Sequence, residues 1–135
     1  MEQTLAIWHE IIASGDTSRL ADILAEDCTF ISPVVHTPQC GRDLTQLYLT
    51  GAAQILANGT FRYVKEVVTS PHAVLEFQCE VDGIEVNGVD IISFDEEGKI
   101  CEFKVMLRPL KAVNLVHAKM RAMLEQLAGA AGDSQ

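Results

Sequence analysis

The stretch that decides the fold is Leu75–Phe94, which has the sequence LEFQCEVDGIEVNGVDIISF. Apolar and polar residues alternate on both sides of Asp82-Gly83, a dipeptide that is typical of the tight turn of a β-hairpin. A turn of this kind sets the pairing of the two strands and places Leu75 opposite Asp90. The sequence therefore predicts an antiparallel hairpin with a defined register.

One face of this hairpin is apolar except for a single acid. Because side chains alternate between the two faces of a strand, the apolar face comprises Leu75, Phe77, Cys79, Val81, Ile84, Val86, Gly88, Asp90, Ile92 and Phe94. Desolvating a carboxylate is costly, so a buried Asp usually has a partner or binds a proton. Two interpretations are open. In the first, Asp90 has a structural role, either at the end of the strand or paired with a basic side chain such as Arg62 or Lys99. In the second, Asp90 is a functional acid on the wall of an apolar cavity.

Composition and charge exclude several classes of protein. The chain has 135 residues, a formal net charge of −9 and no cluster of Lys and Arg. Nucleic acids and anionic membranes are bound by basic patches, so we expect neither as a partner. The cysteines and histidines are scattered, so we expect no metal and no cofactor. Free thiols and the lack of a signal-like or membrane-spanning segment favour the cytoplasm.

The rest of the chain is predicted to surround the hairpin with helices and further strands. Helical spacing and strand-like alternation predict these elements in order: helices over 3–14, 17–26 and 42–56, strands over 28–32, 61–69, 73–82, 84–94 and 99–108, and a helix over 110–127. The turn at 95–98 places Phe94 opposite Lys99 and hence Phe103 opposite Asp90. We expect a single domain over 1–128 and a mobile tail over 129–135.

This order of elements predicts an α+β fold. Helices with one early strand precede an antiparallel meander, so we expect a cone-shaped, curved antiparallel sheet wrapped around the N-terminal helices, plus a C-terminal helix. A sheet that curls over helices encloses a cavity walled by its apolar face. Such a cavity with a few converging polar groups is the usual place for a small ligand.

Several short motifs over residues 5 to about 110 resemble the nuclear transport factor 2-like superfamily, which includes the SnoaL-like cyclases and ketosteroid isomerase. These motifs are Gly15-Asp16, Ala25-Glu26-Asp27-Cys28-Thr29-Phe30, Pro33-Val34 with Pro38 and Gly41, Val89-Asp90-Ile91-Ile92-Ser93-Phe94 and Gly98-Lys99-Ile100. Their order and spacing are specific for the fold and less so for an activity. The resemblance is to a SnoaL-like or ketosteroid isomerase-like domain.

The resemblance also implies roles for particular positions. In ketosteroid isomerase a tyrosine and a neutral aspartic acid form an oxyanion hole, and an aspartate acts as the base. The tyrosine position matches Trp8, the base position Ser32, and the neutral-acid position Asp90. A serine hydroxyl cannot shuttle a proton between carbons near neutral pH, so ketosteroid isomerisation by that mechanism is disfavoured. The resemblance further implies that Trp8, Phe30 and Ser32 line one cavity; Trp8 could equally be a plain core aromatic.

Candidate site residues follow from both arguments. We expect Asp90 to be the catalytic acid and His36, in the loop over 33–41, to be a possible base, because imidazole exchanges protons near pH 7. A solvated loop histidine is the alternative for His36. The expected ligand-binding residues are Trp8, Phe30, Ser32, Phe77 and Phe103.

Three classes of function remain open at this point. The first is a cofactor-independent isomerase, cyclase, dehydratase or hydrolase that acts on a small apolar molecule. The second is a protein that binds such a molecule without turnover, and the third is a dimeric scaffold module with a vestigial pocket. A homodimer is expected through the outer sheet face, because that face carries Val89, Ile91, Ile100 and Met106.

Overall fold

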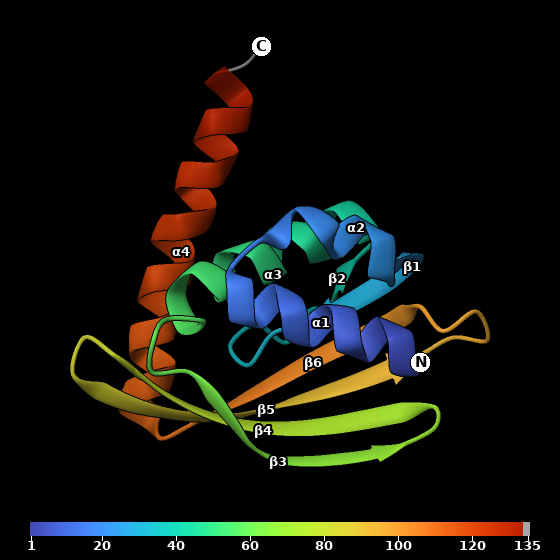
Figure 1. The fold of residues 1–135 in the computed structure, drawn as a ribbon. Helices are drawn as coiled ribbons and strands as arrows, with labels where there is room; N and C mark the ends of the chain where they lie inside the picture. The colour runs from blue at the N-terminus through green and yellow to red at the C-terminus, as the bar shows by residue number, and fades with distance from the viewer. Residues whose placement is uncertain (134–135) are drawn as a thin grey trace.

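The computed structural model describes residues 1–133, with side chains described as far as residue 127, and it has an α+β architecture (Figure 1). The elements in chain order are α1 (Glu2–Ser14), a 3₁₀ turn (Thr17–Arg19), α2 (Leu20–Ile23), β1 (Leu24–Ile31), β2 (Gln39–Cys40), α3 (Arg42–Leu56), β3 (Arg62–Thr69), β4 (His72–Val81), β5 (Ile84–Phe94), β6 (Ile100–Arg108) and α4 (Leu110–Asp133). The six-stranded sheet has the order β2-β1-β6-β5-β4-β3. It is curved and unclosed, and α1, α2 and α3 lie over one of its faces (Figure 1). The predicted fold class is confirmed.

The register of the β4–β5 hairpin is the predicted one. Leu75 pairs with Asp90 and Phe77 with Gly88 across the two strands. The turn holds Asp82 at φ 51° and Gly83 at φ 79°, a backbone conformation that Asp-Gly adopts readily and that matches the twist of the strands. The inward side chains of both strands are buried, except that Ile84 beside the turn is half-buried. The alternation in the sequence thus correctly identifies the core face.

The pairing of β5 with β6 differs from the prediction. Asp90 lies opposite Val105 rather than Phe103, because Phe94 already pairs with Ile100 in place of Lys99 and the register then shifts again between Ser93 and Phe94. The displacement at Asp90 is two positions, so Phe103 and Val105 still point into the core. At the start of β6 the offset is a single position, which turns Ile100 inward and buries it completely. The expectation that Ile100 contributes to the outer face is therefore wrong.

The first long strand begins earlier than its sequence suggests. Apolar residues at Leu20, Ile23 and Leu24 have helical spacing, yet α2 ends at Ile23 and β1 starts at Leu24. Leu24 pairs with Ile100 in parallel orientation, so the sheet contains one parallel pair among antiparallel ones. Pairing with β6 overrides the local helical periodicity.

Helix α4 packs against α3 and then rises beyond the rest of the molecule (Figure 1). Ala112 and Val116 are buried, whereas Leu110 is 74% exposed. The helix continues to Asp133, so the tail expected over 129–135 begins inside it and its last two residues lie outside the described part. In the described residues, no helix is long and apolar enough to cross a membrane.

Candidate functional site

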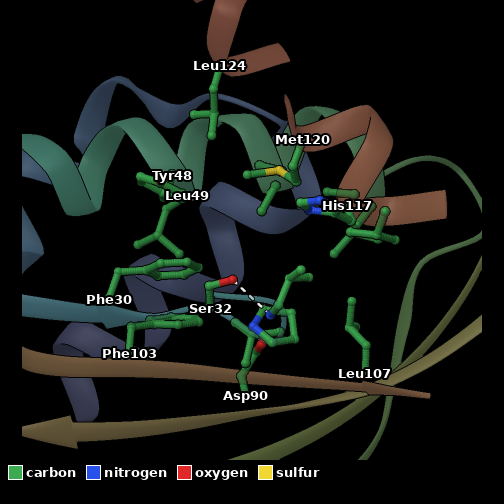
Figure 2. Close-up of a pocket in the computed structure, with 18 of the residues that line it drawn as sticks. Phe30, Ser32, Tyr48, Leu49, Asp90, Phe103, Leu107, His117, Met120 and Leu124 are labelled. Atoms are coloured by element: carbon green, nitrogen blue, oxygen red, sulfur yellow. Dashed lines mark hydrogen bonds between the residues drawn. The ribbon is translucent and has the colours of Figure 1, made fainter. Parts of the chain in front are cut away.

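A cavity of about 300 Å³ lies between the concave face of the sheet and helices α3 and α4. This volume is at the lower end of the range for small-molecule sites. Six of the predicted site residues line it, namely Trp8, Phe30, Ser32, Phe77, Asp90 and Phe103. Figure 2 shows Asp90 and Leu107 on the sheet side and Met120 and Leu124 on the opposite side. The sheet and α4 thus enclose a largely apolar space.

Asp90 lies in the wall of this cavity and is only 5% exposed. Its strand neighbours are Leu75 on β4 and Val105 on β6, which cannot solvate a charge. The hydroxyl of Tyr63 donates a hydrogen bond to Oδ2 of Asp90 at 2.6 Å, and Nε1 of Trp8 donates to the Tyr63 hydroxyl at 2.9 Å. Three side chains from α1, β3 and β5 therefore form one hydrogen-bonded chain.

Burial decides the protonation of Asp90. It raises the pKa of this carboxyl from 3.8 to about 7, and the hydrogen bond from Tyr63 opposes that rise. The two basic residues that the sequence suggests as partners of Asp90 make hydrogen bonds to other groups. Arg62 donates to the side chain of Gln78 at 2.8 Å, and the ammonium of Lys99 donates to the backbone carbonyl of Asp22. The structure therefore favours an acid on the wall of an apolar cavity over an ion pair.

Aromatic rings form much of the cavity wall around Asp90. The rings of Trp8 and Phe103 meet edge to face with their centroids 4.9 Å apart, and Phe30 stacks on Tyr48 at 5.4 Å. Aromatic pairs favour such edge-to-face and offset-stacked arrangements. The wall that these rings form is apolar and largely aromatic, which suits a flat, apolar body.

Ser32 and His36, which lie at the start of the loop and within it, differ in whether they line the cavity. Ser32 lines the cavity, and its Oγ accepts hydrogen bonds from the backbone N–H groups of Val34 and Val35 at 3.0 and 3.2 Å. His36 is exposed and is not among the described residues that line the cavity. The tight turn that Ser32 stabilises directs Val34 and Val35 to the cavity and leaves His36 outside it. This placement does not support His36 as a base for Asp90.

A family model for the SnoaL-like domain matches residues 6–103. The chain belongs to the SnoaL-like domain family. It shares the fold of a steroid delta-isomerase from Pseudomonas aeruginosa with a TM-score of 0.87 and 33% identity, covering 94% of this chain and 93% of that one. An uncharacterised protein with a cystatin-like fold from Silicibacter pomeroyi is 35% identical, with a TM-score of 0.83 and coverages of 90% and 85%. No curated protein matches the chain.

A more distant relative shows likeness of fold alone. SalBIII, an epoxide hydrolase/cyclase-like enzyme with a role in pyran ring formation in the polyether salinomycin, is 18% identical. Its TM-score is 0.64, and the match covers 79% of this chain and 89% of that one. The match to the SnoaL-like family model, together with the likeness to the steroid delta-isomerase, places this SnoaL-like domain in the nuclear transport factor 2-like superfamily.

Tyr63 is the hydrogen-bond partner of Asp90 that the sequence analysis of this SnoaL-like domain missed. It lies on β3, and the pairing of β3 with β4 is irregular between Tyr63 and Lys65. The only signal in the sequence is the aromatic alternation of Phe61 and Tyr63 at the start of the strand. It indicates a shared face, but it does not indicate that the hydroxyl reaches Asp90.

The cavity mouth carries polar side chains from α4. His117, Arg121 and Glu125 lie one helical turn apart and line the cavity, and Nη2 of Arg121 lies 3.3 Å from Nε2 of His117. Helix α4 therefore gives the apolar cavity a polar rim. Within the part of the chain that the structure describes, no group of three or more His, Cys, Asp and Glu is placed to hold a metal ion.

Proposed function

We propose that this SnoaL-like domain binds a small, largely apolar molecule in the cavity and that Asp90 presents a proton to an oxygen atom of that molecule. The observation that carries the proposal is a buried carboxyl, neutral below about pH 7, in an aromatic wall. A neutral carboxylic acid in apolar surroundings is a strong hydrogen-bond donor. Its placement supports recognition of a carbonyl, ether or epoxide oxygen.

We propose acid catalysis without a cofactor as the activity of the site, in an isomerase, cyclase, dehydratase or hydrolase. The steroid delta-isomerase from Pseudomonas aeruginosa, at 33% identity, supports this class. Ser32 stands at the position of the base in ketosteroid isomerase, and its hydroxyl cannot carry a proton between carbons. The reactions that fit best need a proton only at oxygen. A C–O bond breaks and its oxygen takes the proton of Asp90, while water or a substrate hydroxyl forms the new C–O bond. The proton that this nucleophile releases restores the neutral carboxyl of Asp90.

Binding without turnover is the second candidate. Among the described residues, Tyr63 is the only side chain that is hydrogen-bonded to Asp90. The other carboxyl and imidazole that line the cavity, Glu125 and His117, lie at its mouth and make no hydrogen bond to the acid, and this favours a binder. Styrene oxide, an apolar epoxide, separates the two candidates. If Asp90 is a catalytic acid, the wild type opens this epoxide faster than Asp90→Asn at pH 6. Equal rates of epoxide opening for the two proteins would instead support binding without turnover.

The binding proposal is tested with two probes of the same shape. We expect 2-acetylnaphthalene, a flat ketone, to bind the wild type in calorimetric titrations. Asp90→Asn keeps the shape and an N–H donor, so its affinity stays within a few-fold. Asp90→Leu loses about tenfold, as one hydrogen bond is worth about 1 kcal/mol. The control probe 2-ethylnaphthalene lacks the oxygen and binds Asp90→Leu no more weakly. Equal ketone affinity for wild type and Asp90→Leu would refute the proposal.

We propose that the protein is a homodimer whose interface is the outer face of the sheet. Exposed apolar side chains on this face support the proposal, including Val67 at 56% and Met106 at 50% exposure. They border a shallow groove that is also lined by Val74 and Val89. No helix of the described residues covers this face (Figure 1), so a second subunit is the natural cover.

We propose the cytoplasm as the location of the protein. The four cysteines, Cys28, Cys40, Cys79 and Cys101, are all free thiols. Thiols of this kind persist where the compartment is reducing, and burial raises the pKa of the Cys79 thiol to about 11, which keeps it protonated and unreactive.

A further inference from the structure

The hydrogen-bonded chain that ends at Asp90 has a fixed direction. The indole N–H of Trp8 can only donate, so the hydroxyl oxygen of Tyr63 is the acceptor in their 2.9 Å contact. Tyr63 has one hydroxyl proton, and that proton points at Oδ2 of Asp90 across 2.6 Å. Donation therefore runs from Trp8 through Tyr63 to Asp90, with Oδ2 as the final acceptor.

The two oxygens of Asp90 consequently have different environments. Oδ2 accepts from Tyr63. In a neutral carboxyl group the carbonyl oxygen is a much stronger acceptor than the hydroxyl oxygen, so this bond favours Oδ2 as the carbonyl oxygen. Oδ1 makes no hydrogen bond with the described residues, yet no buried side-chain oxygen among them is left unsatisfied. Since Asp90 lines the cavity, Oδ1 must face that open space.

We propose that Tyr63, anchored by Trp8, is a positioning residue that keeps the proton of Asp90 on Oδ1, so that the inner end of the ligand must be a hydrogen-bond-accepting oxygen. The ligand part of this inference rests on the proposed function. Trp8 occupies the position that carries the oxyanion-hole tyrosine in ketosteroid isomerase, and here it donates to Tyr63. Asp90 is then the only member of the three that offers a proton to the cavity.

Few other charged groups face the pair. On the far side of Tyr63, Nε2 of His9 in α1 lies 2.9 Å from a carboxylate oxygen of Glu66 in β3, and on the cavity side α4 contributes His117, Arg121 and Glu125 at the mouth. The β4 and β6 neighbours of Asp90 are apolar. Burial and the bond from Tyr63 are the two causes that set the pKa of Asp90, so Tyr63 is the residue through which this pKa is adjustable.

The experiment compares Tyr63→Phe with the wild type by ¹³C NMR titration of the Asp90 carboxyl. The Tyr63 bond favours the carboxylate, so its loss should move the midpoint up by at least half a pH unit. Trp8→Phe removes the hydrogen bond that anchors Tyr63 and should move the midpoint in the same direction. This second variant provides the test if the Tyr63→Phe protein does not fold. Tyr48→Phe removes a hydroxyl from another ring of the same cavity and is the matched control, expected to leave the midpoint in place.

Binding of 2-acetylnaphthalene provides the second measurement. Its affinity for the wild type should fall as the pH rises through 7, because ionised Oδ1 no longer donates, and in Tyr63→Phe the fall should come at higher pH. An unmoved or lowered midpoint in both variants would overturn the role of Tyr63 while the wild type still binds the ketone. A ketone affinity that rises with pH would overturn the inference that the inner end of the ligand is a hydrogen-bond-accepting oxygen. No ketone binding at any pH, with a shifted midpoint, would refute the proposed function and leave the positioning role supported.

Discussion

At the scale of single residues, Asp90 owes its properties to the side chains that surround it. Leu75, Val105 and aromatic rings replace the water that would solvate its charge. One hydrogen bond, from Tyr63, offsets part of that loss. The carboxyl is therefore neutral where an exposed Asp is ionised, and the neutral form can donate to a ligand.

This neutrality predicts how stability depends on pH. The pKa of Asp90 is about 7 in the folded protein, against 3.8 for an Asp in an unfolded chain. The folded state holds the proton more tightly. The contribution of Asp90 to the free energy of unfolding is therefore fully present below pH 3.8 and is lost as the pH rises through about 7. The resulting loss in the free energy of unfolding is on the order of 4 kcal/mol.

Urea unfolding of the wild type and Asp90→Asn between pH 4 and pH 8 measures this effect. Asn has no proton to lose, so the variant should gain stability relative to the wild type as the pH rises. Asp43→Asn makes the same change at an exposed position and is the matched control. Parallel stability curves for the wild type and Asp90→Asn would contradict the raised pKa.

At the scale of elements, the pairing of β4 with β5 shapes the cavity floor. Gly88 lies opposite Phe77, and a Cβ atom at Gly88 would stand 2.3 Å from Cζ of Phe77 and 2.8 Å from Cδ2 of Leu107. The absence of a side chain lets the Phe77 ring lie across the strand. Phe77 and Leu107 both line the cavity, so the glycine controls its width.

Gly88→Ala should therefore both destabilise the protein and shrink the cavity. We expect a loss of about 1–3 kcal/mol, typical of overpacking, and weaker binding of 2-acetylnaphthalene, because Phe77 must move. Gly59→Ala is the control, since a Cβ there meets nothing within 4 Å. Chemical denaturation and calorimetric titration check both effects. If Gly88→Ala matches Gly59→Ala in stability and binding, the close approach of Phe77 does not constrain the site.

At the scale of the whole molecule, the helices gather on one face of the sheet and leave the other face open (Figure 1). The open face presents apolar side chains such as Val67 and Met106 together with Lys65 and Glu76. Polar and apolar groups side by side are typical of interfaces between subunits. The concave face holds the cavity, so assembly through the open face leaves the cavity free.

The proposed dimer gives a prediction at this scale. Val67→Glu places a charge in the open face and should weaken association at least tenfold, while the fold is retained by circular dichroism. Val35→Glu makes the same change at a similarly exposed valine in the loop by the cavity and should leave association unchanged. Sedimentation at micromolar concentration measures both. A monomeric wild type in that experiment contradicts the dimer.

The sequence by itself determined the hairpin, its register and the side of the strand on which Asp90 lies. These features depend on a turn and on an alternation with period 2, which are local properties of the chain. The core positions of Phe77 and Phe103 follow from the same rule, and both residues line the cavity.

Only the tertiary structure decided the partners of Asp90 and the limits of the site. Tyr63 is 27 residues away from Asp90, and Trp8 is 55 residues away from Tyr63, so no local pattern links them. The pairing of Phe94 with Ile100 buried Ile100, and the irregularity that follows in the β5–β6 pairing brought Val105 beside Asp90. The turn at Ser32 left His36 in solvent. Such features arise from the packing of distant segments, where a shift of one residue in pairing reverses the direction of a side chain.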